Sequence, residues 1–185
     1  MDLESFYNSI LNIGNKDKYN DIVKIVKEEK ARLLENTNSL DGFCKYLANQ
    51  IEYEIKTNLS GVWVNSIDLN ELVQVDHVVL LAEYHNNDDM KRLLIDPTFS
   101  QFTKSSDKKL VGLASWPSEN LDESFRDKLL TDGVVEVDDT SFNRYLDSFG
   151  NHYQDINLDR YLRDRKADKI KWKKHTKKLK HQVSY

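Results

Sequence analysis

The spacing of apolar residues switches partway along the chain from a helical period to an extended one, and this switch most constrains the fold. Isoleucine, valine and leucine recur at helical spacing over residues 19–35, which predicts an amphipathic helix. Phe43, Leu47, Ile51 and Ile55 then repeat every four residues. We therefore expect a second long helix that buries one face.

The chain beyond this helix is rich in valine and leucine and predicts extended structure. Strands are expected over 61–69, 71–84 and 90–99, followed by a helix near 120–131, a strand at 133–137 and a helix near 140–149. A short helix before Gly14 and a basic helix from about 158 complete the expected elements. Helices followed by mostly antiparallel strands indicate an α+β domain.

Charge divides the 185 residues into two regions. Residues 163–185 hold ten Lys and Arg against two acidic residues, a net charge of +8, whereas residues 1–162 hold 17 basic and 29 acidic residues, a net charge of −12. We therefore expect one domain over 1–162, with its core at 39–102, and a basic helical extension over 163–185. The extension could dock on the acidic body, hold an acidic partner or contact nucleic acid.

The only cysteine, Cys44, falls at the expected start of the second helix, close after the N-cap candidates Ser39 and Asp41. A lone cysteine is often a small apolar core residue. At a helix start, however, unpaired N–H groups and the helix dipole favour an anion, so the thiolate would be stabilised there. A nucleophilic cysteine is the alternative interpretation, and it requires a histidine elsewhere in the chain.

The predicted hairpin supplies such a histidine together with a carboxylate. Facing residues of a tight antiparallel hairpin have numbers with a constant sum. A turn centred on Asn86 and Asn87 gives a sum of 173 and places His77 opposite Asp96. A sum of 175 makes the two diagonal neighbours on the same face, whereas an even sum separates them.

These residues predict a cysteine triad. His77 would take the proton of the Cys44 thiol and later deliver it to the leaving group, while Asp96 would orient the imidazole. These three residues give the chain a resemblance to papain-like cysteine enzymes, which place an oxyanion-stabilising amide about six residues before the cysteine. Asn38 occupies that spacing, so the resemblance implies that its side chain, or the Cys44 N–H, could bind an oxyanion. Asn36 and Gln50 could be confused with Asn38 in this role.

Cysteine at a helix start, then histidine in "DHVVLLAEY", then aspartate in "LLIDPTFSQF", resembles the transglutaminase-like and papain-like cysteine enzyme superfamily. The Asp-Pro-Thr context of Asp96 is similar to that of transglutaminase cores. Gln101 and Phe102 complete a pattern similar to deamidase domains of bacterial toxins and effectors, although strand-end packing is the plainer interpretation of both. The resemblance covers residues 39–102. It implies a papain-like core with the catalytic cysteine at the start of a central helix packed on an antiparallel sheet.

The resemblance implies a thiol-dependent acyl-transfer enzyme acting on an amide of a protein or peptide through a thioester. Cysteine proteolysis, glutamine deamidation and transglutaminase-type cross-linking are its possible reactions. The alternative is a non-catalytic binding module of the same fold, whose basic tail holds an acidic partner or nucleic acid. An exported effector of this family would act on a protein of its host.

Other chemistry has little support in the sequence. One cysteine and scattered histidines lack zinc-ligand spacing, and no glycine-rich phosphate loop occurs, so we expect no metal and no cofactor. The N-terminal residues lack an apolar run of signal-peptide type, and no segment is apolar enough to span a membrane. A cytoplasmic protein is expected, with signal-independent export left open.

Overall fold

The computed structural model describes residues 18–87, 89–103, 116–150, 152 and 154–167. The chain divides into two compact units, 1–153 and 154–185. The sequence had suggested a boundary at 162. The predicted helix before Gly14 and most of the basic tail lie outside the described residues.

The first unit combines helices with one antiparallel sheet, as the sequence predicts. Its elements in chain order are α2 (Lys18–Leu34), α3 (Cys44–Asn58), β1 (Val62–Asp68), α4 (Asn70–Val73), β2 (Val78–Asn86), β3 (Asp89–Ile95), the 3₁₀ turns η1 (Phe99–Phe102) and η2 (Pro117–Glu119), α5 (Glu123–Asp132), β4 (Val134–Glu136) and α6 (Asp139–Asp147). The strands lie in the order β1-β2-β3-β4, and each neighbouring pair is antiparallel.

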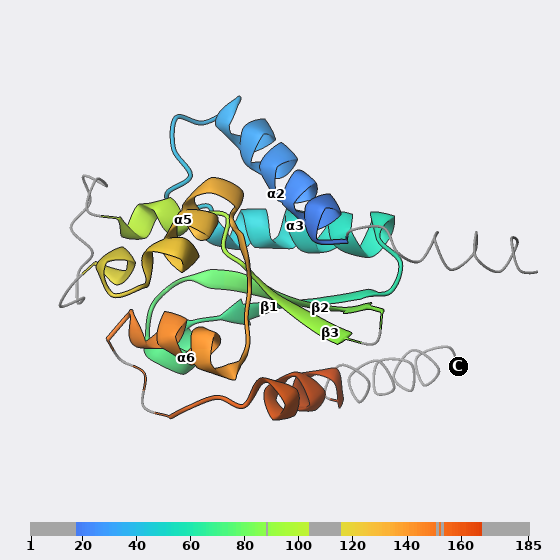
Figure 1. The fold of residues 1–185 in the computed structure, drawn as a ribbon. Helices are drawn as coiled ribbons and strands as arrows, with labels where there is room; N and C mark the ends of the chain where they lie inside the picture. The colour runs from blue at the N-terminus through green and yellow to red at the C-terminus, as the bar shows by residue number, and fades with distance from the viewer. Residues whose placement is uncertain (1–17, 88, 104–115, 151, 153, 168–185) are drawn as a thin grey trace, which may run out of the picture. The chain divides into compact units, whose positions relative to one another are not determined.

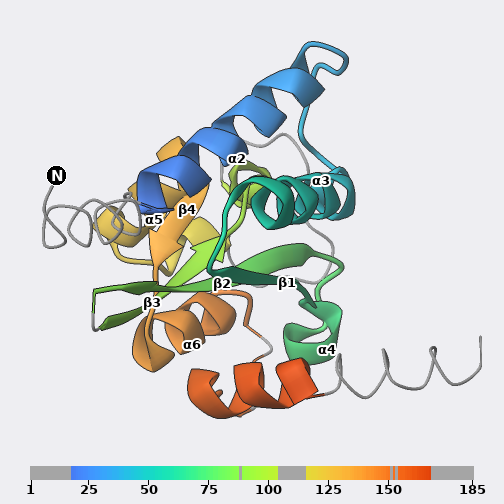
Figure 2. The same cartoon turned by 90° about the vertical axis from the view of Figure 1, so that its right-hand side faces the viewer.

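Helices cover both faces of this sheet (Figures 1 and 2). Helices α2 and α3 pack on one face, where Leu80 and Ala82 of β2 join their buried side chains in one apolar cluster. Helix α6 lies on the opposite face. Because both faces are covered, the central strand β2 is apolar along most of its length instead of alternating with polar residues.

The hairpin of β2 and β3 has the second of the two registers considered above. Leu80 pairs with Ile95 and Asn86 with Asp89, so facing residue numbers sum to 175 and not to 173. Asn87 in the turn adopts φ 55°, a left-handed conformation that asparagine tolerates. The odd sum preserves the predicted result, because His77, just before β2, and Asp96, just after β3, remain on the same face.

Three local expectations were wrong. Residues 70–73 form the short helix α4 and not part of a strand. The strand predicted over 90–99 ends at Ile95, because Pro97 cannot donate to a ladder, and the chain turns into η1 instead. Helix α3 has Phe43 as its N-cap, without a side-chain cap, instead of Ser39 or Asp41.

A close approach between α5 and the end of β3 fixes the backbone at Asp96. Gly133, φ 69°, ends α5, and its carbonyl accepts the Asp96 N–H at 2.9 Å. A Cβ at Gly133 would lie 3.0 Å from Val26 and 3.3 Å from the Pro97 Cα. Glycine therefore satisfies both the left-handed backbone and the lack of space.

The second unit contains a helix over 158–167, in agreement with the basic helix predicted from about residue 158. Across the described parts of both units, no helix is long and apolar enough to cross a bilayer.

Candidate active site

A tight turn delivers Cys44 to the first position of α3. The Phe43 N–H donates to the Leu40 carbonyl at 3.2 Å, and Gly42 adopts φ 76° within this turn. Glycine suits the third position of a turn that needs positive φ. Cys44 is half-buried, so the residue is not sealed within the core.

His77 lies directly before β2 and is completely buried. Its carbonyl accepts the Leu69 N–H at 2.8 Å, and its own N–H donates to the Val75 carbonyl at 2.8 Å. The edge of its ring packs against Phe102, with ring centroids 4.7 Å apart and planes at 79°. Backbone and ring are therefore both held by contacts within the protein.

The Cys44 thiol and the His77 imidazole shift each other's pKa. Partial burial opposes ionisation of Cys44, but a hydrogen bond with the His77 side chain and the charge of that ring outweigh it, so the pKa of Cys44 is lowered. The N–H groups of Val78 and Lys45 also bond the sulfur and lower its pKa. A thiolate at this position thus has one side-chain and two backbone partners.

His77 shifts in the opposite direction. Burial lowers its pKa, but the charge of Asp96, followed by contacts with Asp96 and Cys44, raises the pKa of His77 to about 9. His77 Nε2 lies 3.0 Å from Asp96 Oδ1, although the N–H direction is poorly aligned with the oxygen. The contact is therefore a buried ion pair at hydrogen-bond distance. A lowered thiol pKa beside a raised imidazole pKa favours a thiolate–imidazolium pair at neutral pH.

The residues after Asp96 explain the Asp-Pro-Thr-x-x-Gln-Phe pattern physically. Thr98 donates its N–H to Asp96 Oδ1 at 3.3 Å and so orients the carboxylate. Gln101 Nε2 lies 3.1 Å from His77 Nδ1 and donates to Thr98 Oγ1 at 3.3 Å. Gln101 and Phe102 lie in η1 and not at the strand end, which is at Ile95, but Phe102 is buried and packs as expected, with its ring against His77.

Tyr145 is the functional candidate that sequence reasoning missed. Its hydroxyl, on α6, donates to Asp96 Oδ2 at 2.7 Å, and the side chain is completely buried. Burial, together with the charge of Asp96, raises the pKa of Tyr145 well above its ordinary value, so the phenol stays protonated. Asp96 is therefore held through both oxygens.

The predicted oxyanion residue is not among the residues that the described hydrogen bonds connect to His77 and Asp96. Asn38 is exposed in the link between α2 and α3. Its role stays a prediction. Gln101 is a second side-chain amide that could serve a developing oxyanion, because its nitrogen already lies beside the imidazole that bonds the thiol.

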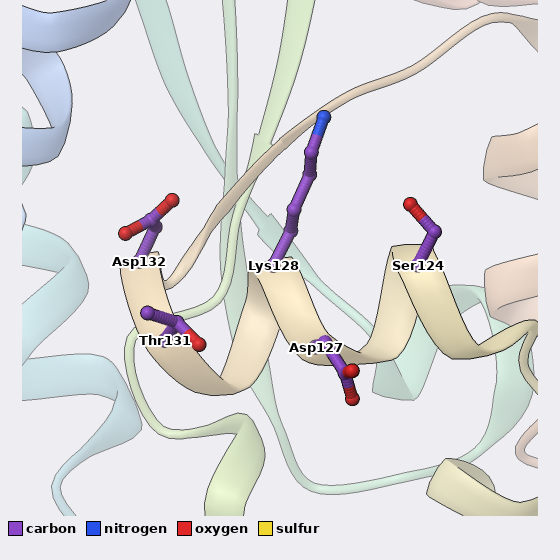
Figure 3. Close-up of a pocket in the computed structure, with 5 residues that line it drawn as sticks. All are labelled: Ser124, Asp127, Lys128, Thr131 and Asp132. Carbon is purple, nitrogen blue, oxygen red and sulfur yellow. The ribbon is translucent and has the colours of Figure 1, made fainter.

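A separate shallow pocket of about 360 Å³ lies along α5 (Figure 3). The side chains that line it come from one helix and include none of the triad: Ser124, Asp127, Lys128, Thr131 and Asp132. Within the described residues, no cluster of three His, Cys, Asp or Glu side chains could hold a metal ion.

The chain matches no protein-family model, and neither the curated proteins nor the solved structures contain a match to it.

Proposed function

We propose that the protein is a thiol-dependent acyl-transfer enzyme that acts on an amide of a protein or peptide, with Cys44, His77 and Asp96 as its catalytic triad. The observation that carries the proposal is the convergence of these three side chains. Three residues from separate parts of the chain come together, because the His77 side chain interacts with the Cys44 thiol and its Nε2 lies 3.0 Å from Asp96 Oδ1. Their opposite pKa shifts support the same assignment.

In the first half-reaction, the Cys44 thiolate attacks the amide carbonyl carbon and forms a C–S bond. The His77 imidazolium gives its proton to the departing nitrogen, so that an amine, or ammonia from a glutamine side chain, leaves as the C–N bond breaks. In the second half-reaction, neutral His77 takes a proton from water or from an acceptor amine as it attacks the thioester. The thiolate then leaves and the pair with His77 is restored.

The activated thiolate is tested by iodoacetamide alkylation of the native protein between pH 5 and 9. We expect the rate to be already at its plateau near pH 6. His77→Ala should slow alkylation at pH 6 by on the order of 100-fold, because an unassisted thiol has a pKa near 8.5. His152→Ala is the matched control, since His152 also pairs with a carboxylate, 2.7 Å from Asp147, without a thiol partner. A thiol that reacts only after unfolding would favour the binding module instead.

The reaction is tested with glutamine-containing protein and peptide substrates, with and without a primary amine. Mass spectrometry distinguishes peptide cleavage, a one-dalton gain with ammonia release, and amine incorporation. Cys44→Ala must abolish every product. Absence of all three products in the presence of a normally activated thiolate would reject these substrates while leaving the nucleophile assignment in place.

The oxyanion donor is tested by comparing Asn38→Ala with Gln101→Ala. Replacing the residue that acts as the donor should lower kcat by about 100-fold without changing the alkylation midpoint, because an oxyanion forms only during acyl transfer. Equal, small effects from both variants would leave the backbone N–H of Cys44 as the donor.

A further inference from the structure

We propose that Tyr145 is a positioning residue of this site, whose hydroxyl holds the Asp96 carboxylate in the orientation that serves His77. The inference rests on the proposed function and extends it to a fourth side chain, on a helix 49 residues away from Asp96.

The hydrogen-bond pattern at Asp96 carries the proposal. Tyr145 Oη donates to Oδ2 at 2.7 Å, whereas Oδ1 lies 3.0 Å from His77 Nε2 and accepts the Thr98 N–H at 3.3 Å. The two oxygens therefore have separate partners. Because Asp96 is completely buried, no water can replace a lost donor, and the hydroxyl both fixes the carboxylate plane and stabilises its charge.

The position of Tyr145 suits this role. Its ring is held among aromatic side chains, with centroids 5.3 Å from Phe149, 6.2 Å from Phe99 and 6.4 Å from Phe125. In a well-packed aromatic cluster the ring cannot swing away, so its hydroxyl is pre-organised. A buried tyrosine needs a partner for its hydroxyl, and here that partner is the carboxylate of the triad.

Four charged or titratable groups interact with Asp96 directly or through a neighbour. They are His77 before β2, Tyr145 on α6, Lys30 on α2 and, through its action on Tyr145 and His77, Cys44 on α3. Burial lowers the pKa of Lys30, while the charge of Asp96 opposes this. Among these groups Tyr145 is the neutral donor, so removing its hydroxyl changes no formal charge.

The test is the pH profile of Cys44 alkylation in Tyr145→Phe, which removes only the hydroxyl. Without it the buried carboxylate is less stable as an anion, His77 loses part of its counter-ion, and the thiolate forms less readily. We expect the alkylation midpoint to rise by about one pH unit, or about tenfold slower alkylation on the acid limb. Tyr161→Phe is the matched control, because it removes a tyrosine hydroxyl that accepts from Arg165 at 3.0 Å and not one that bonds Asp96, and it should leave the midpoint unchanged.

A double-mutant cycle separates positioning from packing. The midpoint shift caused by Tyr145→Phe should vanish in an Asp96→Asn background, because the hydroxyl would have no carboxylate to hold. A shift that persists there, or a Tyr145→Phe profile identical to wild type, overturns the proposal. Failure of the proposed function looks different, since the wild-type protein would then show an ordinary thiol profile insensitive to His77→Ala.

If the Tyr145→Phe variant does not fold, the contact can be tested by NMR on the wild-type and Asp96→Asn proteins instead. With ¹³Cζ-labelled tyrosine, one signal of the nine tyrosines should stay in the neutral form at high pH and move in Asp96→Asn. If no buried tyrosine signal responds to Asp96→Asn, the assignment of Tyr145 is wrong.

Discussion

Helices α3 and α6 begin in opposite ways. Helix α6 starts with a complete capping box: Asp138 accepts the Ser141 N–H at 2.7 Å, and the Ser141 hydroxyl accepts the Asp138 N–H at 2.9 Å. Helix α3 starts at Cys44 behind Phe43, which has no side-chain oxygen and makes no cap hydrogen bond.

The difference shows what each helix start is used for. At α6 the side chains satisfy the backbone donors, which stabilises the helix. At α3 the Lys45 N–H bonds the Cys44 sulfur instead. A capping carboxylate at α3 would compete for these donors and place a negative charge beside a thiolate. The missing cap therefore costs helix stability and leaves the helix start available to an anion.

Moving the cysteine from the start of α3 to the start of α6 should give the largest effect. Asp139 is the first residue of α6, as Cys44 is of α3. In Cys44→Ala/Asp139→Cys, we expect alkylation at pH 6 to be at least on the order of 100-fold slower than that of Cys44, because α6 offers the thiolate no imidazolium and places the Asp138 carboxylate beside it. Equal rates would mean that His77 contributes nothing.

The pH dependence of stability should differ between wild type and Cys44→Ala. The pKa of His77 rises from 6.5 to about 9 on folding, so its contribution is complete below pH 6.5 and is lost as the pH rises through 9. The lowered Cys44 pKa contributes oppositely, with stability gained as the pH rises toward 9.0. These changes offset each other in wild type.

Cys44→Ala removes the offsetting gain. Between pH 6 and 9, we expect the free energy of unfolding of Cys44→Ala to fall by about 1–2 kcal/mol more than that of wild type. The estimate uses about 1.4 kcal/mol per pKa unit and allows for a smaller rise in the pKa of His77 when the thiolate is missing. Urea unfolding at both pH values measures the difference, and other titrating groups cancel between the two proteins. Parallel curves would contradict the coupling.

Removing the cap of α6 should affect stability alone. Asp138→Ala is expected to lower the free energy of unfolding by about 1 kcal/mol at pH 7, without changing Cys44 alkylation. The Ser141 hydrogen bonds lower the pKa of Asp138 below 3.8, so the effect should be present above pH 3.8 and disappear in more acidic solution. Slower alkylation in this variant would show that the two helix starts are coupled.

Adding a cap to α3 should give the smallest effect and sharpen the comparison. Phe43→Asp and Phe43→Asn lose the same apolar contacts and gain similar capping oxygens, but only aspartate is charged. We expect alkylation at pH 6 to be about threefold slower in the aspartate variant, because a negative charge at the helix start raises the thiol pKa. Equal rates would mean that the charge at this position does not reach the sulfur.

The sequence predicted the parts of the site that depend on local pattern. Four-residue spacing predicted α3 with Cys44 in its first turn, and hairpin parity placed His77 and Asp96 on one face. The exact register could not be obtained, because sums of 173 and 175 use the same asparagine-rich turn and the same face. The end of β3 was missed although Pro97 stood in the predicted strand.

Tyr145 could not be placed by such reasoning, because its partner is 49 residues away and lies on another element. One signal was present. Phe142, Tyr145 and Phe149 recur at helical spacing in the sequence, and only the middle one carries a hydroxyl. An apolar face with one polar atom indicates that a partner is needed, but not which one.

The complete burial of His77 and Asp96 beneath a half-buried Cys44 has a consequence for the route that protons take. His77 and Asp96 have no surface in contact with bulk water, so Cys44 is the only one of the three residues that solvent reaches. If the proposed acyl transfer takes place, the leaving group must therefore receive its proton from His77 beside the newly formed thioester.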